Sequence, residues 1–98
     1  MMPAQRFPTN ENASVEVYGR LGTYRTTLRN LSASGACLEW MSTQLPVDKG
    51  DLLRIMIDLK SVGKVRHVSA EVVWNHEGKT GINFLSPDKV LEKMLEKV

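Results

Sequence analysis

The stretch Asn30-Leu31-Ser32-Ala33-Ser34-Gly35-Ala36-Cys37-Leu38 decides how the rest of the chain is interpreted. It joins two segments that alternate between apolar and polar residues, so it predicts a tight turn between two strands. Asn30 and Ser32 carry short polar side chains that commonly stabilise turns, and Gly35 is expected to supply the backbone freedom that the turn needs, because glycine alone enters positive φ without steric cost. Such a turn also gathers hydrogen-bonding groups in a small concavity, which suits an anionic ligand. The stretch is therefore compatible with a purely structural hairpin turn or with a ligand-binding corner.

Residues on both sides of this turn alternate between apolar and polar side chains, which is typical of strands with one buried face. The expected strands cover residues 14–18, 24–29, 36–40, 53–59, 65–74 and 80–84. In the longest of them, four residues are predicted to point into the core: Val68, Ala70, Val72 and Trp74. Short segments that contain Gly or Pro separate most of the strands and predict turns and loops.

The last part of the chain predicts a helix. Ser86 is a favourable N-cap and Pro87 is favourable at the first helical position, so the helix is expected to cover residues 87–98. Its apolar stripe is predicted to pack against the sheet, and it consists of Val90, Leu91, Met94, Leu95 and Val98.

Six short strands and one terminal helix predict an all-β fold with a single helix. The expected architecture is a six-stranded antiparallel β-barrel, because closure removes exposed strand edges. Residues 1–12 are polar, contain Pro3 and Pro8 and show no period, so they are predicted to form a flexible N-terminal arm. The barrel is expected at residues 13–86, and residues 87–98 are expected to be an amphipathic helix of the same domain.

The composition agrees with one globular domain. The chain has 98 residues, of which 42% are hydrophobic, and its net charge of +2 demands no polyanionic partner. No apolar run is long enough for a membrane helix, and the N-terminus lacks the apolar core of a secretory signal, so no membrane partner is expected. Cys37 is the only cysteine, which excludes an internal disulfide and favours a reducing, cytoplasmic location.

Three classes of site have little support in the sequence. Cys37, His67 and His76 lack the spacing of metal ligands, so no metal site is expected. Ser32 and Ser34 do not lie in a nucleophile elbow, so no enzyme activity, catalytic residue or cofactor is expected. Binding of a nucleic acid polymer would need basic residues interleaved with exposed aromatic ones, but only 6% of the residues are aromatic. A binding or regulatory module fits the sequence best.

The turn Asn30-Leu31-Ser32-Ala33-Ser34-Gly35 resembles the (D/N)xSxxG motif of PilZ domains, the bacterial receptors for cyclic di-GMP. The segments Ala70-Glu71-Val72-Val73-Trp74 and Gly81-Ile82-Asn83-Phe84 resemble the paired late strands of that family. Arg6-Phe7-Pro8 resembles the end of the family's RxxxR motif. The likeness covers nearly the whole chain. It implies a PilZ-like split barrel that takes part in bacterial signalling, with motility or biofilm formation as its output.

The resemblance implies a set of ligand-binding residues: Arg6, Asn30, Ser32, Gly35 and Trp74. Arg6 would lie on the arm that folds over the nucleotide, where its guanidinium can meet the O6 and N7 of a guanine. Asn30 and Ser32 would hydrogen-bond guanine or phosphate. Gly35 would let the backbone approach the ligand, and Trp74 would add a further contact. Ordering of the arm would then present a changed surface to a protein partner.

Met2 stands four residues before Arg6, where the family motif has its first arginine. Either that arginine has been lost, or it lies in a segment that precedes the sequence. Loss of one charge-assisted pair costs about 1.5–3 kcal/mol, which Arg25 or Arg29 could offset. Two hypotheses follow. One is a module that senses cyclic di-GMP, and the other is a degenerate PilZ domain that acts as a protein–protein adaptor in pilus or flagellar control.

Overall fold

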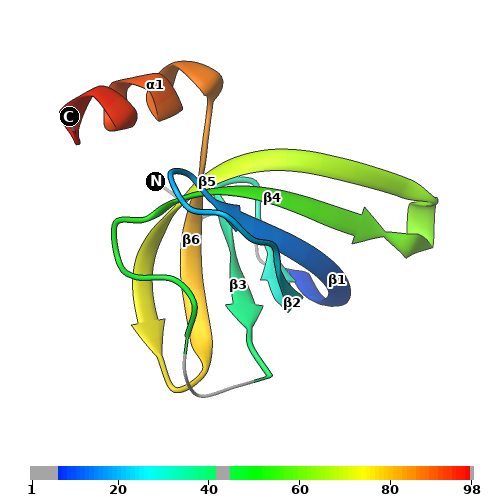
Figure 1. Cartoon of the computed structure of the whole chain (residues 1–98). Helices are drawn as coiled ribbons and strands as arrows, with labels where there is room; N and C mark the ends of the chain where they lie inside the picture. The colour runs from blue at the N-terminus through cyan, green and yellow to red at the C-terminus, as the bar shows by residue number, and fades with distance from the viewer. Residues whose placement is uncertain (1–6, 42–44, 98) are drawn as a thin grey trace, which may run out of the picture.

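The computed structural model of the chain describes residues 7–41 and 45–97 (Figure 1). The described elements are β1 (Phe7–Val17), β2 (Tyr24–Leu31), β3 (Gly35–Glu39), β4 (Leu52–Leu59), the 3-10 turn η1 (Lys60–Val62), β5 (Lys64–His76), β6 (Lys79–Leu85) and α1 (Pro87–Glu96). All neighbouring strands are antiparallel, and they close a barrel in the order β1-β2-β3-β6-β5-β4. The prediction of a six-stranded antiparallel barrel followed by one helix is therefore confirmed.

Apolar side chains that alternate along the strands fill the interior of the barrel. The hydrophobic residues with no exposed surface are Val15, Leu28, Leu38, Leu53, Ile55 and Ala70. They come from five of the strands, so the core links β1 to β5 through side-chain packing as well as through backbone pairing. Burial of one large aliphatic side chain stabilises a fold by about 1.5–3 kcal/mol.

A chain of hydrogen bonds satisfies the polar groups at one end of the core. The indole N–H of Trp40 donates to Oγ1 of Thr80 at 2.7 Å, and this hydroxyl donates to Oδ1 of Asn75 at 2.6 Å. The Asn75 amide then donates to the carbonyl oxygen of Val47 at 2.8 Å. These bonds connect the end of β3 to β5, β6 and the loop before β4. None of the buried side-chain nitrogen and oxygen atoms in this network lacks a hydrogen-bond partner.

Strand β1 begins at Phe7, earlier than the sequence predicted. Phe7 pairs with Leu31 and Pro8 pairs with Asn30, so the second half of the predicted arm belongs to the sheet. The register of β1 shifts just after Pro8, and such an irregularity interrupts the apolar–polar period. This part of the strand was missed because its evidence is a long-range pairing with β2 and not a local pattern. Residues 1–6 of the predicted arm lie outside the described residues.

Helix α1 begins where it was predicted, since the Ser86 hydroxyl accepts a hydrogen bond from the backbone N–H of Lys89 at 3.4 Å. Val90 is the only buried residue of the helix. The exposed members of its apolar stripe are Leu91, Met94 and Leu95, at 58%, 41% and 64%. The prediction that the whole stripe packs on the sheet is therefore wrong for the described residues; Val98 lies outside them.

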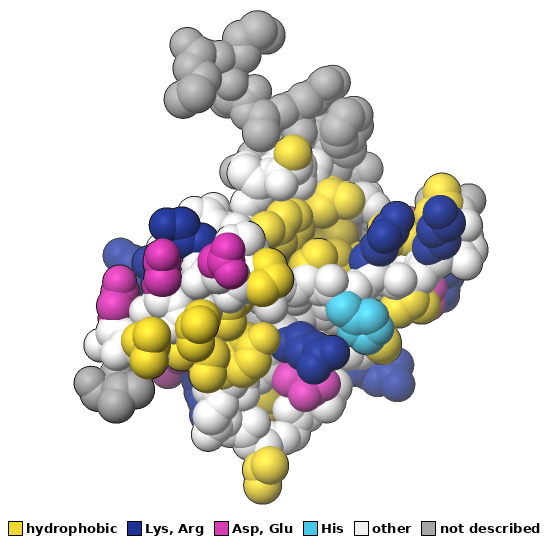
Figure 2. Space-filling view, turned by 90° about the horizontal axis from the view of Figure 1, so that it is seen from above, with side chains coloured by type: hydrophobic (Ala, Val, Ile, Leu, Met, Phe, Trp, Pro, Cys, Tyr) yellow, Lys and Arg dark blue, Asp and Glu magenta, His cyan; other side chains and the backbone are white. Residues whose placement is uncertain are grey.

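The exposure of the stripe follows from the closure of the barrel. The strands bury their apolar faces against one another, so they leave little apolar sheet surface for a helix to cover. Helix α1 lies over one end of the barrel, where Lys93 forms an ion pair with Glu71 of β5 at 3.4 Å (Figure 1). Seen from above, this end of the molecule exposes hydrophobic side chains between charged ones (Figure 2).

Among the described residues, no helix has the length and apolar character needed to span a bilayer.

Candidate functional site

Four residues lie side by side across four neighbouring strands and form what we call the outward row: Asn30, Cys37, Gly81 and Trp74. Asn30 of β2 pairs with Cys37 of β3, and Cys37 pairs in turn with Gly81 of β6. Gly81 pairs with Trp74 of β5. Directly paired residues of antiparallel strands point to the same side of the sheet. Because Leu38, the neighbour of Cys37, points into the core, the row points to the outside of the barrel.

A β-bulge in β2 brings Asn30 into this row. Leu28 pairs with Leu38, and Asn30 pairs with Cys37, so two residues of β2 advance the register by one residue of β3. Arg29 is the additional residue. In a regular strand without a bulge, Asn30 would point to the same side as the buried Leu28, two residues before it. The bulge therefore turns the Asn30 amide away from the core.

A second bulge, in β5, does the same for Trp74. Val72 pairs with Ile82 and Trp74 pairs with Gly81, so Val73 is the additional residue. Val72 is 1% exposed, whereas Trp74 is 42% exposed. The prediction that Trp74 continues the inward face of its strand is wrong, because it assumed an uninterrupted period of two. Its placement as an exposed residue is compatible with the role that the family resemblance implied.

Gly81 lets the Trp74 side chain lie close to the sheet. A Cβ atom at Gly81 would overlap Nε1, Cε2 and Cδ1 of the indole. A glycine opposite an aromatic residue is a known way to cover a strand that lacks a side chain. The ring thus lies over the β6 backbone, and only the small side chain of Cys37 separates this position from Asn30 in the row.

Gly35 is required for a different reason from the one expected. Its φ is not positive, so the turn makes no use of the left-handed region there. Instead, a Cβ atom at Gly35 would overlap the backbone carbonyl oxygen of Ile82. The glycine permits close contact between β3 and β6 at the start of the pairing. A role for this residue toward a ligand remains a prediction.

The Ser32 hydroxyl is used inside the β2–β3 turn. It accepts hydrogen bonds from the backbone N–H groups of Ser34 at 3.3 Å and Gly35 at 3.2 Å, and it can donate to the Gly35 carbonyl at 3.2 Å. Ser32 is only 7% exposed. The turn is also tied to β6, because the Phe84 N–H donates to the Ser34 carbonyl at 2.9 Å. Ser32 therefore acts on the turn's shape, as the structural interpretation of the motif expected.

The start of β1 lies beside the same turn. Phe7 pairs with Leu31 and Pro8 pairs with Asn30, which places the first described residues next to the motif. Arg6 itself lies outside the described residues. For the N-terminal arm to fold over a nucleotide at the motif, the first strand must begin on the side of the motif, and the pairing meets this condition.

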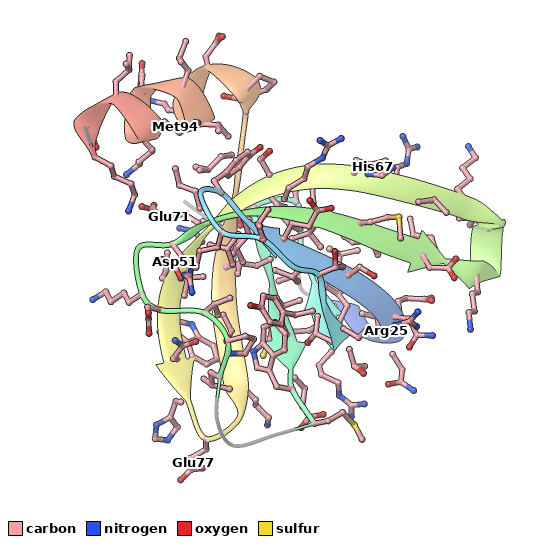
Figure 3. All side chains as sticks on the ribbon, viewed as in Figure 1. Arg25, Asp51, His67, Glu71, Glu77 and Met94 are labelled. Atoms are coloured by element: carbon pink, nitrogen blue, oxygen red, sulfur yellow. The ribbon has the colours of Figure 1, made fainter. Side chains whose placement is uncertain are left out.

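Neither arginine that was considered as a substitute for the missing motif residue is well suited to that role. The guanidinium of Arg29 donates to Oδ1 of Asn10 at 2.8 Å and forms an ion pair with Glu39 at 3.3 Å. Arg25 lies five residues before Asn30 on β2, which corresponds to roughly 17 Å along an extended strand. Figure 3 shows Arg25 at the edge of the barrel far from α1.

Sequence reasoning missed Cys37 and Gly81 as members of the candidate site. Gly81 had a detectable signal, since a glycine within a strand often marks a bulge or a close approach. Cys37 had none, because its place in the row depends on the registers of β2 and β6. Its side chain is only 6% exposed, and as the single cysteine of the sequence it forms no internal disulfide. Among the described residues, no group of three His, Cys, Asp or Glu side chains is arranged to hold a metal ion.

Comparison with known proteins agrees with this architecture. Solved structures of PilZ domains are similar over nearly the whole chain. The PilZ domain of CeSA from a cellulose-synthesising bacterium has 14% identity and a TM-score of 0.70, with 97% of this chain and 95% of that chain covered. The PilZ domain of YcgR from Escherichia coli, solved with c-di-GMP, has 15% identity and a TM-score of 0.71, with 98% and 89% covered.

A third structure, the Bacillus subtilis inhibitor of motility MotI/DgrA, has 18% identity and a TM-score of 0.65. It covers 98% of this chain, and this chain spans 49% of it. No curated protein is detectably similar in sequence. The family profile for the PilZ domain matches residues 4–98, which is nearly the complete sequence. The chain therefore belongs to the PilZ domain family.

Proposed function

We propose that this domain binds cyclic di-GMP on the outward row and the adjoining β2–β3 turn. The family is one of regulatory binding domains, not enzymes. The observation that carries the proposal is that two bulges turn both Asn30 and Trp74 to the outside, in one row beside the motif turn. The Asn30 amide has donors and an acceptor for guanine or phosphate, and the Trp74 indole offers a face on which a base can stack.

Arg6 is proposed to supply the positive charge at this site. It directly precedes Phe7, whose register partner Leu31 belongs to the motif. A guanidinium can donate two parallel hydrogen bonds to the O6 and N7 of guanine, and it also pairs well with phosphate. Nucleotide binding would order the residues ahead of β1 and thereby change the surface offered to a protein partner.

Ser32 and Gly35 are proposed to support binding indirectly. The Ser32 hydroxyl is already engaged with Ser34 and Gly35, so its contribution is to hold the turn in a shape that presents ligand-binding groups. Gly35 keeps β3 against β6, which aligns Cys37 with Gly81 in the row.

Isothermal titration calorimetry with cyclic di-GMP tests the proposal. The unmodified chain is expected to give saturable heat, and Arg6→Ala is expected to weaken binding about tenfold to 150-fold, because one charge-assisted pair is lost. Arg66→Ala is the matched control. Arg66 is exposed on β5 opposite Ile57, away from the row, so its removal is expected to leave the affinity unchanged. Absence of saturable heat at about 500 µM nucleotide, for which the free energy of binding would be about −4.5 kcal/mol, would contradict the proposal.

A second function, that of an adaptor without nucleotide binding, is favoured by Met2 at the position of the first motif arginine. The variant Met2→Arg separates the two functions. If the unmodified chain gives no heat of binding with cyclic di-GMP and Met2→Arg does, only that arginine is lacking. If neither protein gives heat of binding, the domain acts through protein contacts alone. In either case the proposed setting is the cytoplasm of a bacterium, in control of motility or biofilm formation.

A further inference from the structure

A cavity of about 400 Å3 lies at the start of α1, where it is lined by residues of β4, β5 and the end of β6, apart from the outward row. Its polar lining consists of Tyr18, Arg54, His67 and Ser69, and its apolar lining includes Val68 and Phe84. Cavities that bind small molecules usually measure about 300–1,000 Å3 and combine an apolar wall with a few polar groups. The cavity therefore has the size and lining of a site for a small amphipathic ligand.

The registers of the strands create this cavity. Pairing between β5 and β6 ends at Ser69 and Leu85, where β6 stops and the chain turns into α1. Strand β5 starts earlier, at Lys64, and its first residues pair with β4 alone. The β4–β5 hairpin consequently extends past the rest of the barrel (Figure 1), and a notch remains beside His67 and Val68. The notch belongs to the sheet itself, so it is present before any ligand arrives.

Two side chains that favour anions lie at the notch without an established partner. Arg54 and His67 point outward from β4 and β5, and neither side chain makes a hydrogen bond or ion pair with another described residue. The hydroxyls of Tyr18 and Ser69 share a hydrogen bond at 3.3 Å, which leaves one of their two O–H groups to donate to a ligand. Figure 3 shows His67 on the upper side of the β4–β5 hairpin, toward α1.

The charge near Arg54 selects the kind of anion. Glu16 of β1 is the register partner of Arg54, and together with Arg54 and His67 it lines an adjoining hollow of about 290 Å3. Because this carboxylate repels anions, a ligand head with one negative charge is favoured over one with two. A carboxylate also matches the two parallel donors of a guanidinium. The wall formed by Val68 and Phe84 favours an apolar group next to that carboxylate.

We propose that this cavity binds a carboxylate carried on an aromatic or branched apolar group. The carboxylate is held by Arg54 with help from His67, Tyr18 and Ser69, and the apolar group lies against Phe84. Two sources share this chemistry: a free aromatic acid and the C-terminal carboxylate of a partner's peptide chain.

The test is an amide NMR titration of the full chain without cyclic di-GMP. Its probes are benzoate, N-acetyl-phenylalanine as a mimic of a peptide C-terminus, and neutral benzamide as a control. Benzoate or N-acetyl-phenylalanine is expected to cause saturable shifts at Arg54, Ser69 and Phe84, with little effect on Asn30. Arg54→Gln is expected to weaken binding at least about tenfold through loss of the charge-assisted pair. Arg66→Gln removes one charge from the same hairpin and is the matched control. It is expected to change the affinity for the acid less than about twofold.

Tighter binding of N-acetyl-phenylalanine than of benzoate identifies a peptide terminus as the source, and the reverse order identifies a free acid. Dispersed spectra of both variants establish that they are folded. The proposal is overturned if neither acid gives saturable shifts at these amides, if benzamide binds equally well, or if the two variants lose affinity equally.

Discussion

The indole of Trp74 lies against the backbone of Gly81, its register partner across β5 and β6, so closely that a Cβ atom at Gly81 would overlap the ring. This contact places the largest side chain of the outward row against the backbone of β6. It follows from the bulge at Val73, which turns Trp74 away from the core. The exposed aromatic surface of the candidate site therefore depends on a glycine that itself has no side chain to offer a ligand.

Gly81→Ala is expected to destabilise the fold by about 1–3 kcal/mol, because the new methyl group forces the indole out of its position. The free energy of unfolding in urea measures the effect. In a Trp74→Ala background the same substitution is expected to be neutral or to stabilise by up to about 1 kcal/mol, since alanine restricts the unfolded chain more than glycine does. Equal losses in both backgrounds would show that the contact between the two residues is not the cause.

Gly35→Ala is expected to destabilise the domain more than Gly81→Ala does. The atom that a Cβ at Gly35 would overlap is the carbonyl oxygen of Ile82, which belongs to a paired strand and cannot rotate away. A loss of about 3 kcal/mol or more is expected, with the urea midpoint as the measurement. A smaller loss than for Gly81→Ala would mean that β3 and β6 can separate at this point.

Ser32→Ala is expected to cost about 1–3 kcal/mol of stability in the absence of any ligand, because the Gly35 N–H loses its buried acceptor. Ser34→Ala is the control, since Ser34 is exposed and its substitution should change stability by less than about 0.5 kcal/mol. If Ser32 contributed only through contact with a nucleotide, both variants would have the stability of the unmodified chain.

Two substitutions in α1 test which part of its apolar stripe is packed. Val90→Ala is expected to cost about 1–2 kcal/mol, because Val90 is 8% exposed and loses two buried methyl groups. Leu95→Ala is expected to cost less than about 0.5 kcal/mol, because Leu95 is 64% exposed. Thermal unfolding followed by circular dichroism compares the two. Comparable losses would indicate that the stripe is covered along its whole length.

Elements with a local signal were predicted well. Leu53, Ile55 and Ile57 alternate without interruption, and β4 covers the predicted residues with one more at its start. The N-cap at Ser86 depends only on its neighbours in sequence, and it was predicted correctly. The motif turn was located correctly because its polar residues and glycine lie together in the sequence.

Features that depend on pairing between distant strands were not predicted. The bulges at Arg29 and Val73 reverse which side Asn30 and Trp74 face, yet neither bulged residue differs from an ordinary strand residue. The exposure of Leu95 depends on how the strands fill the barrel, which the period of a helix does not reveal. Sequence thus predicted the fold and the motif, whereas the geometry of the candidate site required the registers.

The most direct test of the proposed function is an amide NMR spectrum of the chain recorded with and without cyclic di-GMP. The account predicts that the largest shifts occur along the outward row, at Asn30, Cys37, Gly81 and Trp74, together with the indole N–H of Trp74, while Arg66 on the β4–β5 hairpin stays unchanged. Shifts confined to other faces of the barrel, or an unchanged spectrum at about 1 mM nucleotide, would contradict it.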